Sequence, residues 1–405
     1  MAKKLLQINP VVRLNTSTGR ILKEIGELAI SEGWDSYVAY SGARDGMPQH
    51  SSRLVPVGDK ADLVTHLLAT RLFDAHGLAS KRTTGSFIRR IKEIDPDVIH
   101  IHNIHGYFLN YPMLFRYLAE SGKPVVWTVH DCWLYTGHCY YYSAAGCDKW
   151  KAGCGNCPQK RAFPASLLFD RSARNWKDKN KAFGSLENLT IVPVSEWIRK
   201  EMASSFLAGK RFRVIHNGID LETFRPEAAG EGKQEGRVYL GVASIWLKEK
   251  GFDDLMTLAG KLLPDEKLVL VGRATDEQKA RIPANVTLIE RTENIGKLAE
   301  LYASSDVFLN PTWQDNYPTV NLESIACGTP VVTYRTGGST EAVADGNGFV
   351  VEQGDVDALL EKAREAASMD KAQTVSRLRE YAIGHFRKED CYKKYIELYE
   401  DLPAR

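Results

Sequence analysis

Short hydrophobic runs alternate with longer amphipathic stretches along the whole chain. In the first half, runs with the length of buried strands occur at residues 5–8, 36–40, 97–102, 125–130, 190–194 and 212–216. Residues 19–32, between the first two runs, have the hydrophobic spacing of a helix. This alternation is typical of βαβ units, in which a parallel sheet is covered by helices on both faces.

The same pattern starts again in the second half. Strand-like runs occur at residues 238–242, 268–271, 286–289, 307–309, 330–333 and 348–351. Between the halves, residues 217–220 lead into a polar, glycine-rich stretch at 226–236 that has the composition of a linker. We therefore predict an α/β fold with two Rossmann-like, doubly wound domains, residues 1–218 and 219–387, and a ligand crevice at the carboxyl ends of the sheets.

Composition narrows the class of protein. A chain of 405 residues is long enough for two domains. Its net charge of +2 does not indicate nucleic-acid binding. No run of about 18 apolar residues exists, and the first residues read as a buried strand rather than a signal peptide. We therefore expect a cytoplasmic protein, in which thiols stay reduced.

One segment of the second half carries candidate chemistry. It contains two carboxylates eight positions apart, Asp315 and Glu323, and Gly328 follows where a helix should end. The first acid is expected on a loop above the sheet, and the second about two turns along a helix whose amino end faces that loop. This arrangement suits a phosphate at the helix start and a sugar diol at the carboxylate. An ordinary loop-to-helix transition with an acidic first turn is the plainer alternative.

The whole segment from Pro311 to Val332 resembles the Glu-x7-Glu element of retaining GT-B glycosyltransferases of the group 1 family, which build glycans from nucleotide sugars. The element is Asp-x7-Glu here, because Asp315 takes the place of the first Glu. Residues 214–220 also resemble the hinge of these enzymes. The resemblance implies two Rossmann-like domains that face each other across a cleft, and a last helix, within 388–405, that packs back on the first domain.

The resemblance also implies roles for this segment. Glu323 would hold the donor ribose, and Asp315 would act at the transferred sugar as a catalytic residue. The donor sugar and phosphates would lie along Asn316, Tyr317, Pro318 and Thr319. No cofactor would be needed for catalysis if lysines and helix dipoles neutralise the diphosphate.

A second catalytic candidate is His130, which ends the run at 125–130 and precedes Asp131. The resemblance makes His130 a contact of the transferred sugar. In a generic sheet protein, a histidine at this place is more often a satisfied hydrogen-bonding residue. His100 and His102 share one strand face and could hold a metal, but the resemblance favours an ordinary strand.

Two loops are candidates for contact with the donor. The loop at 9–20 includes Gly19, which would let a ligand approach the backbone, although an ordinary helix start capped by Thr18 is the alternative. In the second half, Lys250 and the glycine after it match part of the family's Arg…Lys-Gly phosphate pattern. The arginine is missing, so Arg273 or Lys248 is the candidate to replace its charge.

Cysteines are concentrated in an insertion at 132–158, which holds five of the seven. In a reduced compartment this density favours metal binding over disulfides. Four of them form the candidate tetrahedral, structural zinc site: Cys139, Cys147, Cys154 and Cys157. Free thiols and a redox pair are the alternatives.

These features predict a glycosyltransferase that moves a hexosyl group from a UDP- or GDP-sugar to a glycan or lipid-linked acceptor with retention, in polysaccharide biosynthesis. A cluster of basic residues at 81–92 could seat the enzyme peripherally on the inner face of the membrane, although a solvated helix face is the default interpretation. The alternatives are an epimerase or phosphorylase of the same fold, or a non-catalytic glycan- or nucleic-acid-binding protein built on the cysteine-rich module.

Overall fold

The computed structural model describes residues 2–14, 16–43, 50–228, 236–343 and 346–403. The chain forms two compact units, one of residues 1–216 with 392–405 and the other of residues 217–391. Much of the linker predicted at 226–236 lies outside the described residues. Within the described ranges, no helix combines the length and the apolar content needed to span a bilayer.

The first unit is built on a parallel sheet. Its described part has seven strands in the order β3-β2-β1-β4-β5-β6-β7. The strands are β1 (Lys4–Ile8), β2 (Asp35–Ser41), β3 (Arg53–Val57), β4 (Val98–Ile101), β5 (Val125–Val129), β6 (Leu189–Pro193) and β7 (Arg211–Phe212). The chain reverses its direction of winding between β1 and β4, so the loops after these strands border the expected binding crevice of this sheet.

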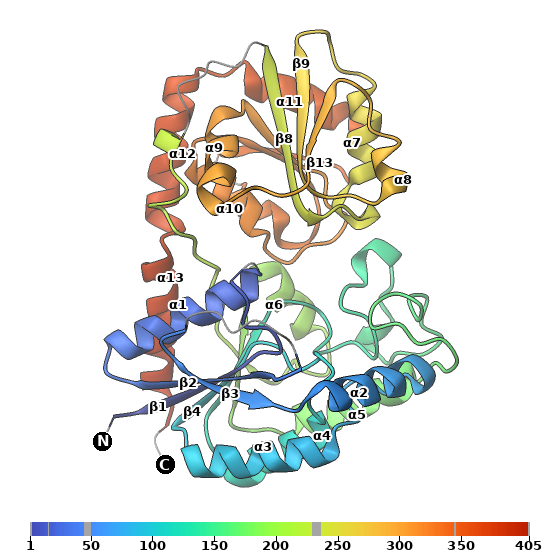
Figure 1. Cartoon of the computed structure of the whole chain (residues 1–405), viewed down its shortest axis with the longest axis vertical. Helices are drawn as coiled ribbons and strands as arrows, with labels where there is room; N and C mark the ends of the chain where they lie inside the picture. Colours follow the sequence, from blue (N-terminus) through green and yellow to red (C-terminus); the bar gives the residue numbers. More distant parts are fainter. Residues whose placement is uncertain (1, 15, 44–49, 229–235, 344–345, 404–405) are drawn as a thin grey trace. The chain divides into compact units, whose positions relative to one another are not determined.

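Helices cover both faces of this sheet, with α1 on one side and α3 and α4 on the other (Figure 1). They are α1 (Ser17–Ser31), α2 (Lys60–Phe73), α3 (Lys81–Ile94), α4 (Tyr111–Ser121), α5 (Ser172–Gly184) and α6 (Glu196–Ala203). The core on the second face contains packed aromatic rings, among them Phe115 and Phe183, whose ring centroids lie 4.6 Å apart with the rings tilted by 57°. Because the central strands are buried on both faces, they read as continuous hydrophobic runs.

The last helix, α13 (Lys388–Asp401), starts in the second unit and belongs to the first unit from Tyr392 onwards. Within the first unit, Tyr395 and Tyr399 of this helix are buried. The Tyr395 hydroxyl accepts a hydrogen bond from Thr128 at 3.0 Å, and the Tyr399 hydroxyl lies 2.6 Å from Nδ1 of His100. The helix is therefore hydrogen-bonded to β4 and β5.

The second unit repeats the architecture with a six-stranded parallel sheet, as far as the described residues extend, in the order β10-β9-β8-β11-β12-β13. The strands are β8 (Arg237–Ile245), β9 (Glu266–Arg273), β10 (Val286–Ile289), β11 (Val307–Asn310), β12 (Val331–Tyr334) and β13 (Gly348–Val351). The helices are α7 (Phe252–Ala259), α8 (Asp276–Lys279), α9 (Ile295–Ser304), α10 (Thr319–Ala326), α11 (Val356–Ala367) and α12 (Lys371–His385). The predicted α/β class is thus confirmed for both units.

Local details differ from the sequence-based expectation. The N-cap of α1 is Thr16 rather than Thr18, because Thr16 has the extended backbone that a cap needs and its hydroxyl accepts from Gly19 N. The run at 212–216 yields only the two-residue strand β7, because β7 pairs only with β6, at the sheet edge, and over two residues.

Candidate active site

In the second unit, Lys250 and Asp315 form an ion pair, although they lie 65 positions apart. Lys250 Nζ is 2.7 Å from Asp315 Oδ2, with the two side chains 38% and 16% exposed. Lys250 lies in the turn after β8, and Asp315 lies in the loop after β11. These adjacent strands end at the same edge of the sheet, which explains why the two side chains meet.

The two loops are tied together by further bonds. Trp313 donates its backbone N–H to Glu249 O at 2.8 Å and its indole N–H to Asp254 Oδ2 at 2.6 Å. Gly251 has φ +75°, and a Cβ there would lie 2.2 Å from Pro311 O, so only glycine fits this approach. These contacts connect the two loops and thereby hold Lys250 in place relative to Asp315.

A buried polar network connects the loop after β11 to α10 and to the turn after β12. Asn310 Nδ2 donates to Asn321 Oδ1 at 2.8 Å, and Asn321 Nδ2 donates to Ser339 O at 2.9 Å. Thr333 links Ser339 back to Asn310 O through its hydroxyl. We did not identify these residues from the sequence. A polar residue at the end of a buried strand, and the Gly337-Gly338 pair after another strand, are the signals that could have found them.

Glu323 lies on α10 with only 3% of its surface exposed. Its Oε2 accepts a hydrogen bond from the Tyr302 hydroxyl at 3.3 Å. Tyr317 precedes α10 and is also buried, and this burial raises the pKa of its phenol. Pro318 is the N-cap of α10, and its side chain offers no hydrogen-bond acceptor, so only its carbonyl caps the helix by accepting from Asn321 N at 3.2 Å.

The other candidates for donor binding are not hydrogen-bonded to the Lys250–Asp315 pair in any contact described here, apart from the chain neighbours of Asp315. Arg273 ends β9 with an exposed side chain, and its carbonyl accepts from Trp246 N at 2.8 Å. Lys248 lies in the same turn as Lys250 and is exposed. Roles for Arg273, Asn316, Tyr317, Pro318 and Thr319 in donor binding stay predictions.

In the first unit, the loop after β1 explains Gly19 without a ligand. A Cβ at Gly19 would lie 2.2 Å from Arg13 O and 2.7 Å from Thr16 Oγ1. The glycine is therefore required by the capping turn itself, while a ligand contact of its backbone stays a prediction.

His130, directly after β5, belongs to a hydrogen-bonded chain that starts at Gln7. Gln7 Nε2 donates to Leu22 O at 3.0 Å, which turns Gln7 Oε1 towards His102 Nε2 at 3.0 Å. His102 Nδ1 in turn lies 3.3 Å from His130 Nε2. Burial lowers the pKa of His130 to about 4 and that of His102 well below its usual range, and nearby histidines add to the effect.

This chain fixes the tautomers of both rings. The amide oxygen of Gln7 can only accept, so His102 Nε2 carries the hydrogen and His102 Nδ1 accepts. His130 Nε2 is then the donor, and His130 Nδ1 carries the lone pair. His130 is therefore a neutral ring that presents an acceptor rather than a cation.

The remaining histidines near this edge also have hydrogen-bond partners. His100 Nε2 is 2.8 Å from Thr128 Oγ1, and His105 Nε2 is 2.8 Å from Asp131 Oδ2. Burial would raise the pKa of Asp131, but the charge and hydrogen bond of His105 and the N–H of Trp133 lower it. Among the residues that the structure describes, no group of three or more His, Cys, Asp or Glu side chains is arranged to hold a metal ion. His100 and His102 instead serve in hydrogen-bonded chains, as expected for residues of an ordinary strand.

The cysteine-rich insertion lies between β5 and α5. The four candidate ligands, Cys139, Cys147, Cys154 and Cys157, line one small cavity together with His138. A hydrogen bond to Cys139 lowers the pKa of Cys157 to about 7, and burial raises the pKa of Cys154 to about 11. The thiols gather as expected, but they do not form a ready metal-binding group, so zinc binding stays a prediction.

Comparisons with known proteins agree with this geometry. The sequence profile described as "Glycosyltransferase Family 4" matches residues 18–223, and that of "Glycosyl transferases group 1" matches residues 224–385. The chain is 23% identical to the putative colanic acid biosynthesis glycosyl transferase WcaC of Escherichia coli, over 98% of this chain and all of that protein. It is 28% identical to the alpha-maltose-1-phosphate synthase of Mycobacterium tuberculosis over 52% of this chain and 60% of that protein.

Solved structures share the fold over almost the whole chain. Sucrose-phosphate synthase from Thermosynechococcus elongatus has a TM-score of 0.70 at 16% identity, with 99% of each chain covered. Anabaena HepE in complex with UDP and glucose has a TM-score of 0.69 at 17% identity, over 99% of this chain and all of that one. With both halves matched and the fold shared, the chain belongs to the group 1 glycosyl transferases, with an N-terminal half of glycosyltransferase family 4 and the GT-B fold.

Proposed function

We propose that this protein transfers a hexosyl group from a nucleoside diphosphate sugar, with UDP or GDP as the nucleotide, to a hydroxyl of a glycan or lipid-linked acceptor, with retention at the anomeric carbon. The pair of Lys250 and Asp315 at the carboxyl edge of the second sheet carries this proposal. It places one fixed cation beside one carboxylate next to the start of α10. A cation and the N-terminal end of a helix suit a diphosphate, and a carboxylate suits a sugar hydroxyl.

In this proposal Lys250 stabilises the negative charge that the leaving diphosphate gains as the sugar–phosphate bond breaks. Lys250 exchanges part of its contact with Asp315 for the phosphate, and Asp315 is then available to a sugar hydroxyl. Asn316 to Thr319 lie along the sugar and phosphates, Glu323 accepts from the ribose hydroxyls, and Arg273 adds charge. Gly19 lies in the loop that would border the phosphates from the first unit.

His130 contributes a neutral acceptor to the transferred sugar. Its Nε2 hydrogen is donated to His102, so Nδ1 is the acceptor atom of the neutral ring. A cation at this place would repel the positive charge that develops on the sugar ring during transfer, so a low pKa for His130 is consistent with this role. No metal or other cofactor takes part in the proposed transfer.

Polysaccharide assembly on the inner face of the membrane is the setting that we propose. WcaC, a relative over nearly the whole chain, is named for colanic acid biosynthesis, which supports a glycan acceptor. Family membership favours transfer over the epimerase, phosphorylase and non-catalytic binding alternatives.

A donor screen tests the proposal directly. The purified chain is incubated with UDP- and GDP-sugars, release of nucleoside diphosphate is measured, and the anomeric configuration of the product is read by NMR. We expect turnover with one donor and a product of the same configuration as the donor. Binding without turnover across the panel, or an inverted product, would contradict the proposal.

A further inference from the structure

The cysteine-rich insertion is part of a long connection with little regular structure. Between the end of β5 and the start of α5, residues 130–171 are all described, and they contain two 3₁₀ turns, η1 (Ser143–Ala145) and η2 (Lys149–Lys151), but no α-helix or strand. Connections of this length without such elements are uncommon in a compact domain and usually serve a specific purpose. A structural metal ion is one means of holding such a connection together.

His138, in this connection, has one ring nitrogen that is paired and one that is not. Its Nδ1 lies 2.6 Å from Asp74 Oδ1, and the two side chains are 1% and 0% exposed. Its Nε2 is also buried, but it has no hydrogen-bond partner among the described residues. A buried polar atom without a partner costs free energy, so His138 Nε2 is expected to bind a further group.

The residue with this unpaired nitrogen lines a small cavity together with four cysteines. The cavity has a volume of about 10 Å³, and its lining residues include His138, Cys139, Cys147, Cys154 and Cys157. A volume of this size is about the least that holds one water molecule. The cavity therefore suits a single small ion and excludes a ligand of several atoms.

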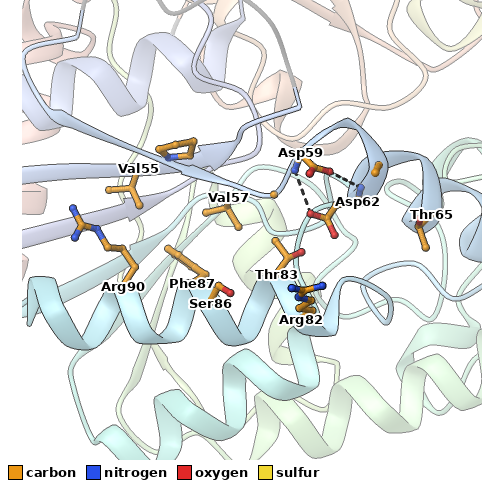
Figure 2. A pocket seen from close by; sticks show the side chains of 13 residues that line it. Val55, Val57, Asp59, Asp62, Thr65, Arg82, Thr83, Ser86, Phe87 and Arg90 are labelled. Carbon is orange, nitrogen blue, oxygen red and sulfur yellow. Dashed lines mark hydrogen bonds between the residues drawn. The ribbon is translucent and has the colours of Figure 1, made fainter.

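A larger cavity of the first unit differs in this respect. It has a volume of about 630 Å³ and lies between α2 and α3. Its two carboxylates, Asp59 and Asp62, each accept the other's backbone N–H in the capping box of α2, at 3.0 and 3.2 Å (Figure 2). Arg90, which also lines it, is paired with Glu93 at 2.8 Å. These charged groups already have partners, whereas His138 Nε2 does not.

Three of the four thiols interact with one another and with His138. The thiols of Cys139 and Cys157 are hydrogen-bonded to each other. Cys157 also interacts electrostatically with Cys154 and with His138. Soft sulfur ligands and an imidazole are the groups that zinc prefers.

Backbone N–H groups point at two of these sulfurs. Gly137 N donates to Cys154 Sγ at 3.2 Å, and the backbone N–H of Gln159 donates to Cys157 Sγ. A hydrogen bond to sulfur stabilises the thiolate, which is the form that binds a metal.

We propose that the insertion holds a structural Zn²⁺ ion through one histidine nitrogen and three thiolates. The ligands are His138 Nε2 and the sulfurs of Cys139, Cys154 and Cys157. Structural zinc sites are tetrahedral, and three cysteines with one histidine are one of their ligand sets. The ion connects residues 138–139 to residues 154–157, on either side of η1 and η2, and so stabilises the insertion that begins directly after Asp131.

Asp74 and His138 have the arrangement of a zinc-binding histidine with its outer partner. A histidine that binds zinc usually donates its other ring N–H to a carboxylate, which fixes the tautomer and orients the ring. Asp74 is placed to accept from His138 Nδ1 in this way, which leaves the Nε2 lone pair for the metal.

Charge and burial select His138 over Cys147 as the fourth ligand. Zinc with three thiolates has a net charge of −1, and zinc with four thiolates has −2. The amine of Lys179 is buried and interacts electrostatically with Cys139 and Cys154, so a single ammonium balances the three-thiolate set. His138 is 3% exposed, whereas Cys147 is only partly buried.

The ligand side chains are not yet grouped around a common centre in the part of the chain that the structure describes. The hydrogen bond between Cys139 and Cys157 accounts for this, because each sulfur is turned towards the other. As zinc binds, each of the three thiols loses its proton to solvent and its sulfur bonds to the metal, so this hydrogen bond is replaced.

Metal analysis of the full chain tests the proposal. The chain is expressed with zinc in the medium, purified under reducing conditions without an affinity tag, and analysed for metal by mass spectrometry. We expect one zinc ion per chain, and X-ray absorption at the zinc edge should find three sulfurs at about 2.3 Å and one nitrogen at about 2.0 Å. Four sulfurs, a disulfide between Cys139 and Cys157, or no zinc either as purified or after titration with a zinc salt would overturn the proposal.

Cys154→Ser is the test substitution, and Cys147→Ser is its matched control, because both replace a thiol that lines the same cavity. After dialysis against a chelator that leaves zinc in the unchanged chain, Cys154→Ser should contain no zinc and Cys147→Ser should keep it. Equal zinc content in the two variants, whether lost or kept, would overturn the ligand set. The X-ray absorption of the unchanged chain decides the matter if Cys154→Ser does not fold.

Asp74→Asn tests the outer partner. Zinc affinity, measured by competition with a chelator, should fall about 10- to 100-fold, because the carboxylate no longer orients His138. Asp74 also accepts from Arg171 N at 2.8 Å, so circular dichroism checks the fold. An unchanged affinity would overturn the assignment of His138 as a ligand. These measurements use no nucleotide sugar, so their outcome is independent of the proposed transfer.

Discussion

The two units bring polar residues to the carboxyl edge of a parallel sheet in opposite electrostatic states. The second unit presents charges, with Lys250 and Asp315 paired at 2.7 Å and partly exposed. The first unit presents neutral rings, because burial and a chain of hydrogen bonds keep His102 and His130 unprotonated. The same architecture can therefore carry charged side chains at one site and neutral rings at the other. The difference follows from solvent exposure, because the charged pair is partly exposed and the rings are shielded from water.

The change with the largest expected effect removes the cation. Lys250→Ala should lower the turnover of the donor about 100-fold, because the leaving diphosphate loses its charge partner and Asp315 is left unpaired. Nucleoside diphosphate release at saturating donor measures this. Lys250→Arg should recover part of the activity.

Lys261→Ala is the control for this experiment, since Lys261 forms an exposed pair with Asp357 in the same unit. Exposed pairs contribute little, so activity and stability should be unchanged. Equal activity of Lys250→Ala and Lys261→Ala would remove Lys250 from the site.

A smaller effect is expected when the buried carboxylate is neutralised. Glu323→Gln keeps the shape of the side chain but loses the charged acceptor, so donor affinity should fall about 10- to 100-fold. Titration calorimetry with the donor nucleotide measures it. Glu352→Gln, at a carboxylate that is 72% exposed in the same unit, should bind the nucleotide unchanged. Turnover at saturating donor should fall less than affinity in Glu323→Gln, and the reverse would assign Glu323 to catalysis instead.

The neutral site can be given a charge by a substitution that keeps the shape of the side chain, although it removes the Gln7 Nε2 donor to Leu22 O. Gln7→Glu places a carboxylate against His102 Nε2, which raises the pKa of His102 and lets its Nδ1 carry a hydrogen as well. His130 Nε2 must then accept, and its own hydrogen moves to Nδ1. We expect turnover to fall about tenfold, with a new decline towards low pH.

Long-range ¹⁵N–¹H NMR of the histidine rings reads the tautomers directly. Tyr399→Phe is the matched control, because it removes a buried hydroxyl bonded to His100 while leaving Gln7, His102 and His130 in place. An unchanged His130 tautomer in Gln7→Glu would show that the chain of hydrogen bonds does not set it.

The smallest expected effect is the response of the unchanged protein to mild acid. Since burial lowers the pKa of His130 to about 4, only about 3% of this ring is protonated at about pH 5.5. Turnover should therefore show no decline from His130 between about pH 7.5 and 5.5.

The free energy of unfolding should also depend on the low pKa values of the buried histidines. The depressed pKa of His130, and of His100 at about 3, contributes stability above about pH 6.5 that is lost as the pH falls towards these values. Urea unfolding at several pH values measures this, and stability that rises below about pH 6 would contradict the neutral assignment.

The pattern of the chain already determined the two α/β halves and the loop that carries Asp315, since continuous buried strands and the Gly328 helix stop are local features. The hydrophobic run at 125–130 also indicated that His130 lies at the end of a strand. They could not indicate that Lys250 would meet Asp315, because strand order, and not sequence distance, brings the loops after β8 and β11 together.

Tertiary structure alone decided the state of the first site. Gln7 and His102 are 95 positions apart and act on His130 only because β1, β4 and β5 are neighbours in the sheet. Phe73 at the end of α2, too, stacks on Phe169, which lies 96 positions later, and no local pattern marks either ring as exposed. Hydrophobic periodicity tells which residues can be buried, but the pKa of a ring and the exposure of a leucine depend on neighbours that only the folded chain supplies.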